Sequence, residues 1–445
     1  MNKKDLSVAF DSPPDTLFNL YSDQGPETRN KKPETFKIMK HLTQAGLLFG
    51  LLFIIACGHS NATVVSAESP VVAIDDAPYV YVCNETSATV TVINANTLEV
   101  VDTVDFKALG FDKNSKPHHV AVEPDGSFWY VSLISAGKVL KFDRQNNLID
   151  SADFETPGML ALHPKEDLIF VGRSMKAVNP PQRIGMLERS SMEMDEVDVF
   201  FPRPHGVVID PRGDYVYTGS LSVNQFLSMN IETGDVNLNK VDGETHTFVQ
   251  FALSPDGTRM VVSGQLTGKV LVFDTTDPSD IKQIKAISVK AAPWHPAFTP
   301  DGKFVYFGNK MANTVTVLNM EKLEVEKVIE GEGLAQPHGI AISPDGKYVF
   351  ISNNNQEMMM MMMGNKEKMG DEHAGHDMDK GDDEHAGHNM DKDEDEHAGH
   401  DMGMKDEKKD PEHGSMVVID TATNEIVKVI ELGFNPTGVG GQPGM

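Results

Sequence analysis

A proline-centred segment recurs along most of this chain, and it limits the fold more strongly than any other feature. Its cleanest copies are PHGVVIDPRGDYVY and PHGIAISPDGKYVF, which start at Pro204 and Pro337. The gaps between successive second prolines are 40, 47, 44, 45, 44 and 99 residues, for Pro124, Pro164, Pro211, Pro255, Pro300, Pro344 and Pro443. A period of about 40–45 residues is typical of propeller blades, each made of four strands.

The last gap is longer than the others because it holds an insertion. Removing the 58 residues 356–413 shortens that gap from 99 to 41 residues, so the seven repeats become evenly spaced. Within a repeat, alternating apolar residues predict strands. Pro-Asp-Gly predicts the turn between strands, because proline presets φ and glycine accepts a positive φ. The chain is therefore predicted to be all-β, a seven-bladed propeller of four-stranded blades with a disordered acidic insertion in one blade.

The last blade is predicted to use both ends of the chain. Only two residues follow Pro443, so the seventh repeat lacks its outer strands there. Residues 79–100 (YVYVCNETSATVTVINANTLEV) match residues 304–325 (FVYFGNKMANTVTVLNMEKLEV), the outer part of a repeat, and have no inner strand of their own. Joining the two ends in one blade closes the ring.

The repeats resemble the YVTN family of seven-bladed β-propellers. YVYV-CN at Tyr79 and VFISN at Val349 stand in the places of the family's Tyr-Val-Thr-Asn, and the resemblance covers residues 79–444 apart from the insertion. It implies the fold but leaves the function open, because such propellers include extracellular binding modules, lactonases and redox enzymes.

The N-terminal residues 1–57 are predicted to be a leader. The apolar run at 45–55 has the length of a signal-peptide core, with Lys37 and Lys40 before it. It ends in Ile-Ile-Ala-Cys, which resembles the lipobox of bacterial lipoproteins, in which the cysteine, here Cys57, carries the lipid. We expect residues 1–38 to precede the true start, a signal peptide at 39–56, a flexible tether at 58–76 and the propeller at 77–445. The expected location is the bacterial cell envelope, outside the cytoplasm and lipid-anchored on the periplasmic face or the cell surface.

Charge and cysteine content exclude several classes of function. The formal net charge of −27 argues against nucleic-acid binding, because a phosphate backbone is bound through clustered Lys and Arg. The two cysteines, Cys57 and Cys83, are too few for a disulfide framework or a cysteine-based zinc site. Cys83 lies in an alternating apolar strand, which predicts a small buried hydrophobe.

The insertion at 356–413 has the composition of a metal-binding segment. It holds 7 of the 16 histidines and 11 of the 24 methionines, including six consecutive methionines at 358–363. Three copies of EHAGHxM each offer two imidazoles and a thioether: His373, His376, Met378; His385, His388, Met390; His397, His400, Met402. Imidazole suits copper, nickel and zinc, whereas thioether is a soft ligand that selects Cu(I). The combination favours copper over zinc or nickel.

The alternative for this segment is an acidic low-complexity loop whose repeats carry no chemistry. Its composition precludes a packed core under either interpretation. If the segment binds metal, each copy should bind modestly, because ordering a flexible chain around an ion costs conformational entropy. Several weak sites suit buffering or capture, whereas a catalytic centre needs ligands held in a fixed geometry.

A second candidate site lies at the mouth of the central channel. Strands alternate in direction within a blade, so the insertion and the start of each inner strand are predicted to share one face of the propeller. That face holds five histidines: His118, His119, His205, His295 and His338. These imidazoles either satisfy backbone groups at the mouth or form a metal or small-ligand site, because inner strands point their first residues at one axis.

Other signals of enzyme chemistry are absent from the sequence. It contains no CxxCH for haem, no GxSxG, no HExxH and no GxxxxGK[ST] for a nucleotide. Trp129 and Trp294 occupy blade positions and are expected to be packing residues, with Trp294 at the channel mouth as the alternative.

The sequence therefore favours an extracytoplasmic lipoprotein that binds metal, copper first, for buffering, resistance or delivery, without catalysis. Its predicted partners are metal ions, the membrane through its anchor, and a protein of the cell envelope. One alternative is an enzyme, either a lactonase-like hydrolase or a copper redox protein that uses the mouth histidines. The other is a non-catalytic surface scaffold that recognises a protein or a glycan.

Overall fold

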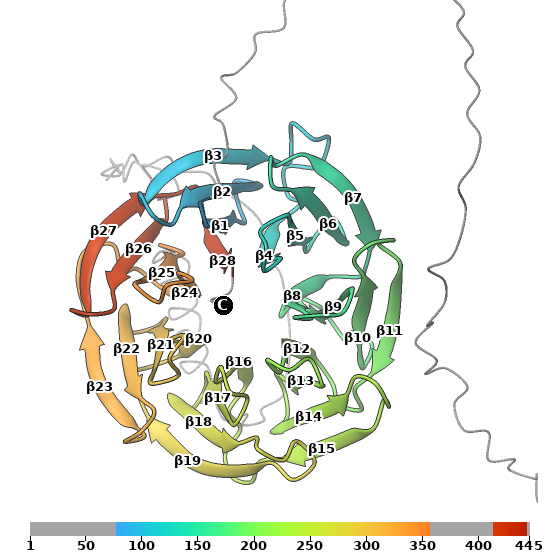
Figure 1. The fold of residues 1–445 in the computed structure, drawn as a ribbon, viewed down its shortest axis with the longest axis vertical. Coiled ribbons are helices and arrows are strands. Elements are labelled where there is room, and N and C mark those ends of the chain that lie inside the picture. The colour runs from blue at the N-terminus through green and yellow to red at the C-terminus, as the bar shows by residue number, and fades with distance from the viewer. Residues whose placement is uncertain (1–76, 357–412, 443–445) are drawn as a thin grey trace, which may run out of the picture. The chain divides into compact units, whose positions relative to one another are not determined.

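The computed structural model describes residues 77–356 and 413–442, which form seven four-stranded antiparallel sheets. Seen down the central axis, the sheets follow one another around a ring, each with one strand close to the centre and one at the rim (Figure 1). The predicted seven-bladed all-β architecture is confirmed. Within the described part of the chain, no helix is long and apolar enough to cross a membrane.

The blades are numbered here along the chain, with strands given from the axis outward. Blade 1 contains β4 (Pro117–Val122), β5 (Phe128–Leu133), β6 (Lys138–Asp143) and β7 (Leu148–Asp153). Blade 2 contains β8 (Pro157–Leu162), β9 (Leu168–Arg173), β10 (Arg183–Glu188) and β11 (Met194–Asp198). Blade 3 contains β12 (Pro204–Ile209), β13 (Tyr215–Ser220), β14 (Gln225–Asn230) and β15 (Val236–Lys240). Blade 4 contains β16 (Phe248–Leu253), β17 (Arg259–Gly264), β18 (Lys269–Asp274) and β19 (Lys282–Ser288).

The remaining blades lead back to the start of the ring. Blade 5 contains β20 (Pro293–Phe298), β21 (Phe304–Asn309), β22 (Thr314–Asn319) and β23 (Glu324–Ile329). Blade 6 contains β24 (Pro337–Ile342), β25 (Tyr348–Asn353), β26 (Ser415–Asp420) and β27 (Glu425–Glu431). Blade 7 contains β28 (Pro436–Gly441), β1 (Tyr79–Asn84), β2 (Thr89–Asn94) and β3 (Glu99–Asp105).

Blade 7 closes the ring with strands from both ends of the chain, as the repeat alignment predicted. The C-terminal β28 pairs antiparallel with the N-terminal β1, so the red and blue ends of the ribbon meet in one sheet (Figure 1). On either side, β28 contacts the inner strands β24 and β4 of the neighbouring blades. The inner strands therefore form an uninterrupted circle around the axis.

The hydrophobic core is divided into layers between blades. The described residues form seven apolar clusters, and each of them joins two adjacent blades. Between blades 7 and 1, for example, the Trp129 ring stacks on Tyr81 and Phe142 at centroid distances of 4.8 and 4.2 Å. Trp129 is fully buried, and its Nε1 donates to Asn146 Oδ1 at 3.1 Å, so the prediction that it is a packing residue is confirmed.

Two kinds of left-handed backbone set the ends of the inner strands. At the turn after the inner strand, Gly257 and Gly346 have φ angles of 71° and 73°, which glycine adopts without steric cost. At the other end, a non-glycine residue with φ between 52° and 58° precedes every inner strand: Lys116, Thr156, Arg203, Thr247, Ala292, Gln336 and Asn435. In all seven blades the backbone therefore makes the same sharp bend just before the inner strand begins.

One position near the end of each second strand accepts only a small residue. The first residue of each inner strand pairs with a residue of the second strand, and the position in question comes just before that partner. From blade 1 to blade 7 it is occupied by Ser132, Gly172, Gly219, Ser263, Gly308, Ser352 and Cys83. The serines bridge blades, since Ser132 Oγ donates to the Gly158 carbonyl at 2.7 Å and Ser352 Oγ donates to the Thr437 carbonyl. The backbone of the next blade passes too close for a larger side chain.

The equivalence of Cys83 with these small residues explains why its side chain is buried, and it predicts the effect of substitutions at this position. The side chain is completely buried, and burial raises the pKa of its thiol well above the ordinary value, so it stays protonated. Because serine occupies the same position in three other blades, Cys83→Ser should change the free energy of unfolding by about 1 kcal/mol or less. Cys83→Leu should cost at least about 2 kcal/mol through overpacking. Urea denaturation of both variants checks this, and a large loss in Cys83→Ser would contradict the purely structural role.

Candidate functional site at the propeller axis

The inner strands are irregular where they approach the axis. In every blade the pairing between the inner strand and the second strand shifts register near the first inner-strand residue, as between Pro337 and Ile340 in β24. Such a bulge changes the direction in which successive side chains point. The second and third residues of several inner strands are thereby gathered around one end of the axis.

The five predicted histidines come together at this end. His118 and His119 lie on β4, His205 on β12, His295 on β20 and His338 on β24. The His338 ring centroid lies 5.2 Å from that of His295 and 6.0 Å from that of His118. Burial lowers the pKa of His295 and of His338 well below the ordinary range, and nearby positive charges add to the effect. Both imidazoles are therefore neutral at neutral pH.

Two of these histidines satisfy backbone groups of a neighbouring blade. His205 Nδ1 donates to the Arg173 carbonyl oxygen at 2.7 Å, and His119 Nδ1 accepts from the Leu160 amide at 3.2 Å. His119 and His205 therefore each make a backbone hydrogen bond through Nδ1, as expected if these imidazoles satisfy backbone groups at the mouth.

His118 and His338 are different, although they occupy the same strand position as His205. The Nδ1 atom of each is buried and has no hydrogen-bond partner among the described residues. The Nε1 atom of Trp294, at the equivalent position of blade 5, shares this property. Trp294 is 5 % exposed and its ring centroid lies 5.2 Å from that of His338, so it lines the axial site instead of serving only the packing between blades.

Three charged residues complete the site, and the sequence analysis missed them. Glu85, Lys176 and Lys310 each follow the second strand of a blade, in blades 7, 2 and 5. Glu85 Oε1 accepts from Lys176 Nζ, and Glu85 Oε2 lies 3.7 Å from His118 Nδ1, an ion-pair distance. Burial raises the pKa of the Glu85 carboxyl, but His118 and Lys176 outweigh it and lower that pKa to about 2. Glu85 and Lys310 directly follow a second strand, whereas Lys176 stands three residues after one, so no shared sequence motif marks the three residues.

We call Glu85, His118, Lys176, Trp294, Lys310 and His338 the axial cluster. It contains an ionised carboxylate, two ammonium groups, two imidazoles and an indole, drawn from five blades. In the part of the chain that the structure describes, no three His, Cys, Asp or Glu side chains are arranged to hold a metal ion. The cluster is thus suited to binding or acid–base chemistry, because it places donors and a carboxylate around a common point.

The insertion is attached at the same end of the propeller. Asn353 pairs with Ser415 across the two strands that flank it, and Asn353 also pairs with Pro337, the residue before His338. The predicted sharing of a face is therefore confirmed by the strand register. The candidate metal ligands themselves, at 373–402, and the predicted lipid attachment site Cys57 lie outside the described residues.

Both attachment points of the insertion are fixed to blade 6 or its neighbour. Gln356 donates its amide to Gln336 Oε1 at 3.1 Å, and His413 Nδ1 donates to the Leu432 carbonyl at 2.9 Å. The His413 ring also packs on Phe434, with centroids 4.3 Å apart. Gln356 and His413 therefore serve the blade, although the sequence analysis placed them inside the insertion.

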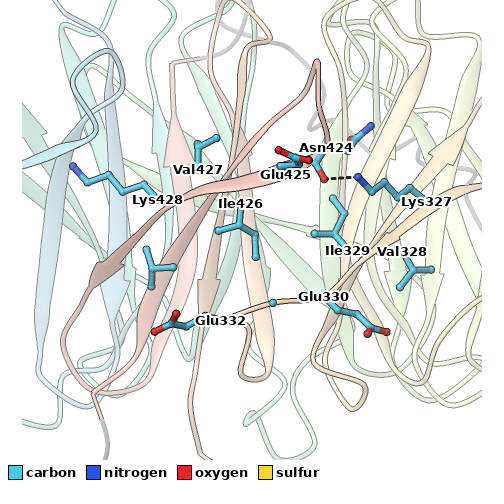
Figure 2. A pocket seen from close by; sticks show the side chains of 12 residues that line it. Lys327, Val328, Ile329, Glu330, Glu332, Asn424, Glu425, Ile426, Val427 and Lys428 are labelled. Carbon is cyan, nitrogen blue, oxygen red and sulfur yellow. Dashed lines mark hydrogen bonds between the residues drawn. The ribbon is translucent and has the colours of Figure 1, made fainter.

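A recess of about 570 Å³ lies away from the axis, between the outer strands β23 and β27. Figure 2 shows its lining, in which Lys327 donates to the Asn424 carbonyl at 2.9 Å while Glu330 and Glu332 lie along the opposite edge. Its charged side chains are exposed or half-buried, and none of its side-chain atoms is a buried group without a partner. The axial cluster, which contains such groups, is therefore the stronger candidate for a functional site.

Fold and site together define a YVTN-type seven-bladed propeller whose axial end carries a buried polar cluster. Residues 71–175 and 184–371 match the family model described as Lactonase, 7-bladed beta-propeller. This match covers more than half of the chain, and the protein belongs to that family.

Individual relatives are more distant. The chain is 24% identical over 150 residues to the uncharacterized protein YncE of Salmonella typhimurium, covering 33% of this chain and 40% of that protein. It is 25% identical over 271 residues to antigen Lp49 of Leptospira interrogans, covering 56% of each. It thus spans roughly half the length of these curated relatives. A solved propeller from Bacteroides uniformis, described as a candidate 6-phosphogluconolactonase, superposes with a TM-score of 0.56 at 14% identity, over 82% of this chain and 100% of that one, which shows the fold alone.

Proposed function

We propose that this protein is a lipid-anchored, extracytoplasmic propeller that binds metal ions, copper first, through its His/Met-rich insertion. The observation that carries the proposal is the threefold EHAGHxM repeat, which supplies six imidazoles and three thioethers within residues 373–402. Imidazole binds Cu(II) well and thioether binds Cu(I), so the set serves both oxidation states. Buffering, resistance or delivery of copper outside the cytoplasm is the role that fits several modest sites.

The use of methionine in place of cysteine fits the proposed location. Outside the cytoplasm a thiol is exposed to oxidation and mispairing, whereas a thioether binds Cu(I) without forming disulfides. The anchor through Cys57 and the tether at 58–76 would hold the propeller at a membrane surface of the cell envelope. The proposed partners are therefore metal ions, the membrane and a protein of the envelope that receives or supplies the ion.

The rigid attachment of the insertion supports a presenting role for the propeller. Both ends of the insertion are bonded to the blade at the axial end, beside Gln336 and Leu432. The two attachment points of the proposed metal-binding segment therefore lie at the axial end, the end that carries the axial cluster.

The deciding experiment is a metal titration of the soluble form that starts at residue 58. Cu(I), Cu(II), Zn(II) and Ni(II) are added to this form and to a variant lacking residues 357–412, which keeps Gln356 and His413 in place. We expect several copper ions to bind the intact chain and essentially none to bind the deletion variant. Thermal melting of both proteins shows whether the propeller has stayed folded.

A substitution variant separates the two kinds of ligand. Replacing the six repeat histidines by glutamine should remove Cu(II) binding and leave Cu(I) binding to the methionines: His373, His376, His385, His388, His397 and His400. Equal binding of copper by the deletion variant and the intact chain would contradict the proposal.

A lactonase-like hydrolase is the second candidate function. Two observations favour it, the family to which the chain belongs and the buried Glu85 carboxylate 3.7 Å from the His118 imidazole. A carboxylate beside an imidazole is an arrangement that general acid–base catalysis uses. Hydrolysis of sugar lactones by the deletion variant, at the same rate as by the intact chain, would establish this function in place of metal binding.

The copper redox and scaffold alternatives have their own signatures in the same titration. A single tight copper ion that survives the deletion would place the metal at the axial histidines and support a redox role. Absence of both metal binding and hydrolysis would leave a surface protein that recognises a protein or glycan through the propeller face.

A further inference from the structure

Two neighbouring ring nitrogens of the axial cluster are buried without a hydrogen-bond partner among the described residues. The indole of Trp294 can only donate, yet its Nε1 is buried without a partner. His338 Nδ1 is also buried without a partner, and it can donate in the tautomer that carries the ring hydrogen there; the two ring centroids are 5.2 Å apart. Buried polar groups in folded proteins are nearly always paired, and leaving one unpaired costs about 1–3 kcal/mol. Two such groups side by side indicate an acceptor that binds between them.

Lys310 adds a positive charge at the same place. Its Nζ lies 4.5 Å from the centroid of the Trp294 ring, and no carboxylate of the described residues is within ion-pair distance of it. Burial lowers the pKa of Lys310 to about 8, so the ammonium remains mostly protonated at neutral pH. The other ammonium, Lys176, is already bonded to Glu85. The charge of Lys310 is therefore the one left without a counterion in this cluster.

The kind of ligand follows from these groups. A metal ion is disfavoured because the Lys310 ammonium repels it and the described residues supply no arranged set of three ligands. A neutral acceptor would satisfy the Trp294 and His338 hydrogens but would leave the charge of Lys310 unpaired. An oxyanion or carboxylate satisfies all three, since its oxygens accept charge-assisted hydrogen bonds from several directions.

We infer that the axial end of the propeller is a binding site for a compact oxyanion or carboxylate, held by the Lys310 ammonium, the Trp294 indole N–H and the His338 imidazole. The His118 ring centroid lies 6.0 Å from that of His338, and His118 Nδ1 lies 3.7 Å from Glu85 Oε2, so these two residues also border the site. The Glu85 carboxylate repels a second negative charge there, so the site favours anions of low charge. This inference does not depend on the insertion or on its metals.

Anion binding can be followed through the protein's own fluorescence. The chain has two tryptophans, and Trp129 is buried between blades 7 and 1, so a ligand at the axis should change the emission of Trp294. The full chain in mild detergent and metal-free buffer is titrated with acetate in one series and inorganic phosphate in another. Chloride keeps the ionic strength constant. A saturable change with acetate alone would identify a carboxylate ligand, and one with phosphate alone an inorganic oxyanion.

Matched lysine variants assign the site. Lys310→Met is expected to raise the half-saturating anion concentration at least tenfold, and Lys310→Arg, which keeps the charge, should stay within about threefold of the unchanged chain. Lys327→Met is the control, because Lys327 lies at the outer rim beside β27 (Figure 2). Trp294→Phe keeps the ring but removes the N–H, and calorimetry should show at least threefold weaker binding.

Several outcomes would overturn the inference. They are the absence of a saturable response to either anion, an unchanged half-saturation in Lys310→Met, or loss of the response in the chain lacking residues 357–412. Should Lys310→Met fail to fold, the comparison of Trp294→Phe with the unchanged chain by calorimetry decides. Failure of copper binding would refute the proposed function and leave this result untouched.

Discussion

A chain that ends at residue 434, and so lacks β28, is expected to lose cooperative folding. β28 is the inner strand of blade 7 and contacts the inner strands on both sides. It also carries hydrogen bonds that join blades, since the Pro436 and Thr437 carbonyls accept from Asn354 and Ser352 of blade 6. Without it, β1 becomes an open edge and two apolar layers are exposed. The loss should exceed about 5 kcal/mol, comparable with the whole stability of a typical domain.

Calorimetry and size-exclusion chromatography measure this effect. Removal of residues 443–445 alone is the control and should leave the melting temperature unchanged, because β28 remains complete. A peptide of residues 433–442 added in trans should restore part of the transition if strand pairing is the cause. A truncated chain that melts like the full chain would show that the ring does not need its closure.

Gly172→Ala is expected to weaken the contact between blades 2 and 3 by about 3 kcal/mol or more. A Cβ atom on Gly172 would lie 2.1 Å from the carbonyl oxygen of His205, so one of the two strands must move. Backbone cannot yield as a flexible side chain can, and overpacking of this kind costs about 1–3 kcal/mol or more. The movement should also break the hydrogen bond from His205 to the Arg173 carbonyl, which is 2.7 Å long.

Ser132→Ala provides the matched control for this substitution. Ser132 occupies the same strand position in blade 1, where a Cβ atom is already accommodated. The substitution removes two hydrogen bonds, one donated to the Gly158 carbonyl and one accepted from the His119 amide. That loss should cost about 2 kcal/mol. Denaturant midpoints of the two variants are compared directly, and equal midpoints would mean that the blades separate more easily than the geometry indicates.

The repeat spacing was sufficient to predict the fold. Seven prolines at near-constant spacing predicted seven blades, and the match between residues 79–100 and 304–325 predicted the shared last blade. Both segments place a buried asparagine at the end of the second strand, where Asn84 donates to Thr89 and Thr91, and Asn309 to Thr314 and Thr316. Repeats preserve such local contacts in the sequence, so strand order could be predicted from it.

The candidate site was only partly predictable, because it is formed by contacts between repeats as well as by positions within a repeat. The five histidines stand at recurring positions, whereas Glu85, Lys176 and Lys310 come from loops of three different blades with no common motif. Which imidazoles are structural also depends on the neighbouring blade, since His205 finds a carbonyl there and His338 does not. Contacts between repeats are set by the ring as a whole, so a pattern within one repeat does not contain them.

The place of β1 in its sheet also has a mechanical consequence. The chain enters the propeller at β1, and this strand lies between β28 and β2 instead of at a free edge. A pulling force at residue 77 would load two hydrogen-bonded ladders at once, in shear, before any strand could be peeled away. A propeller tethered by its N-terminal end would therefore resist drag and surface motion at its seam, the point where a ring joined from two chain ends would otherwise open first.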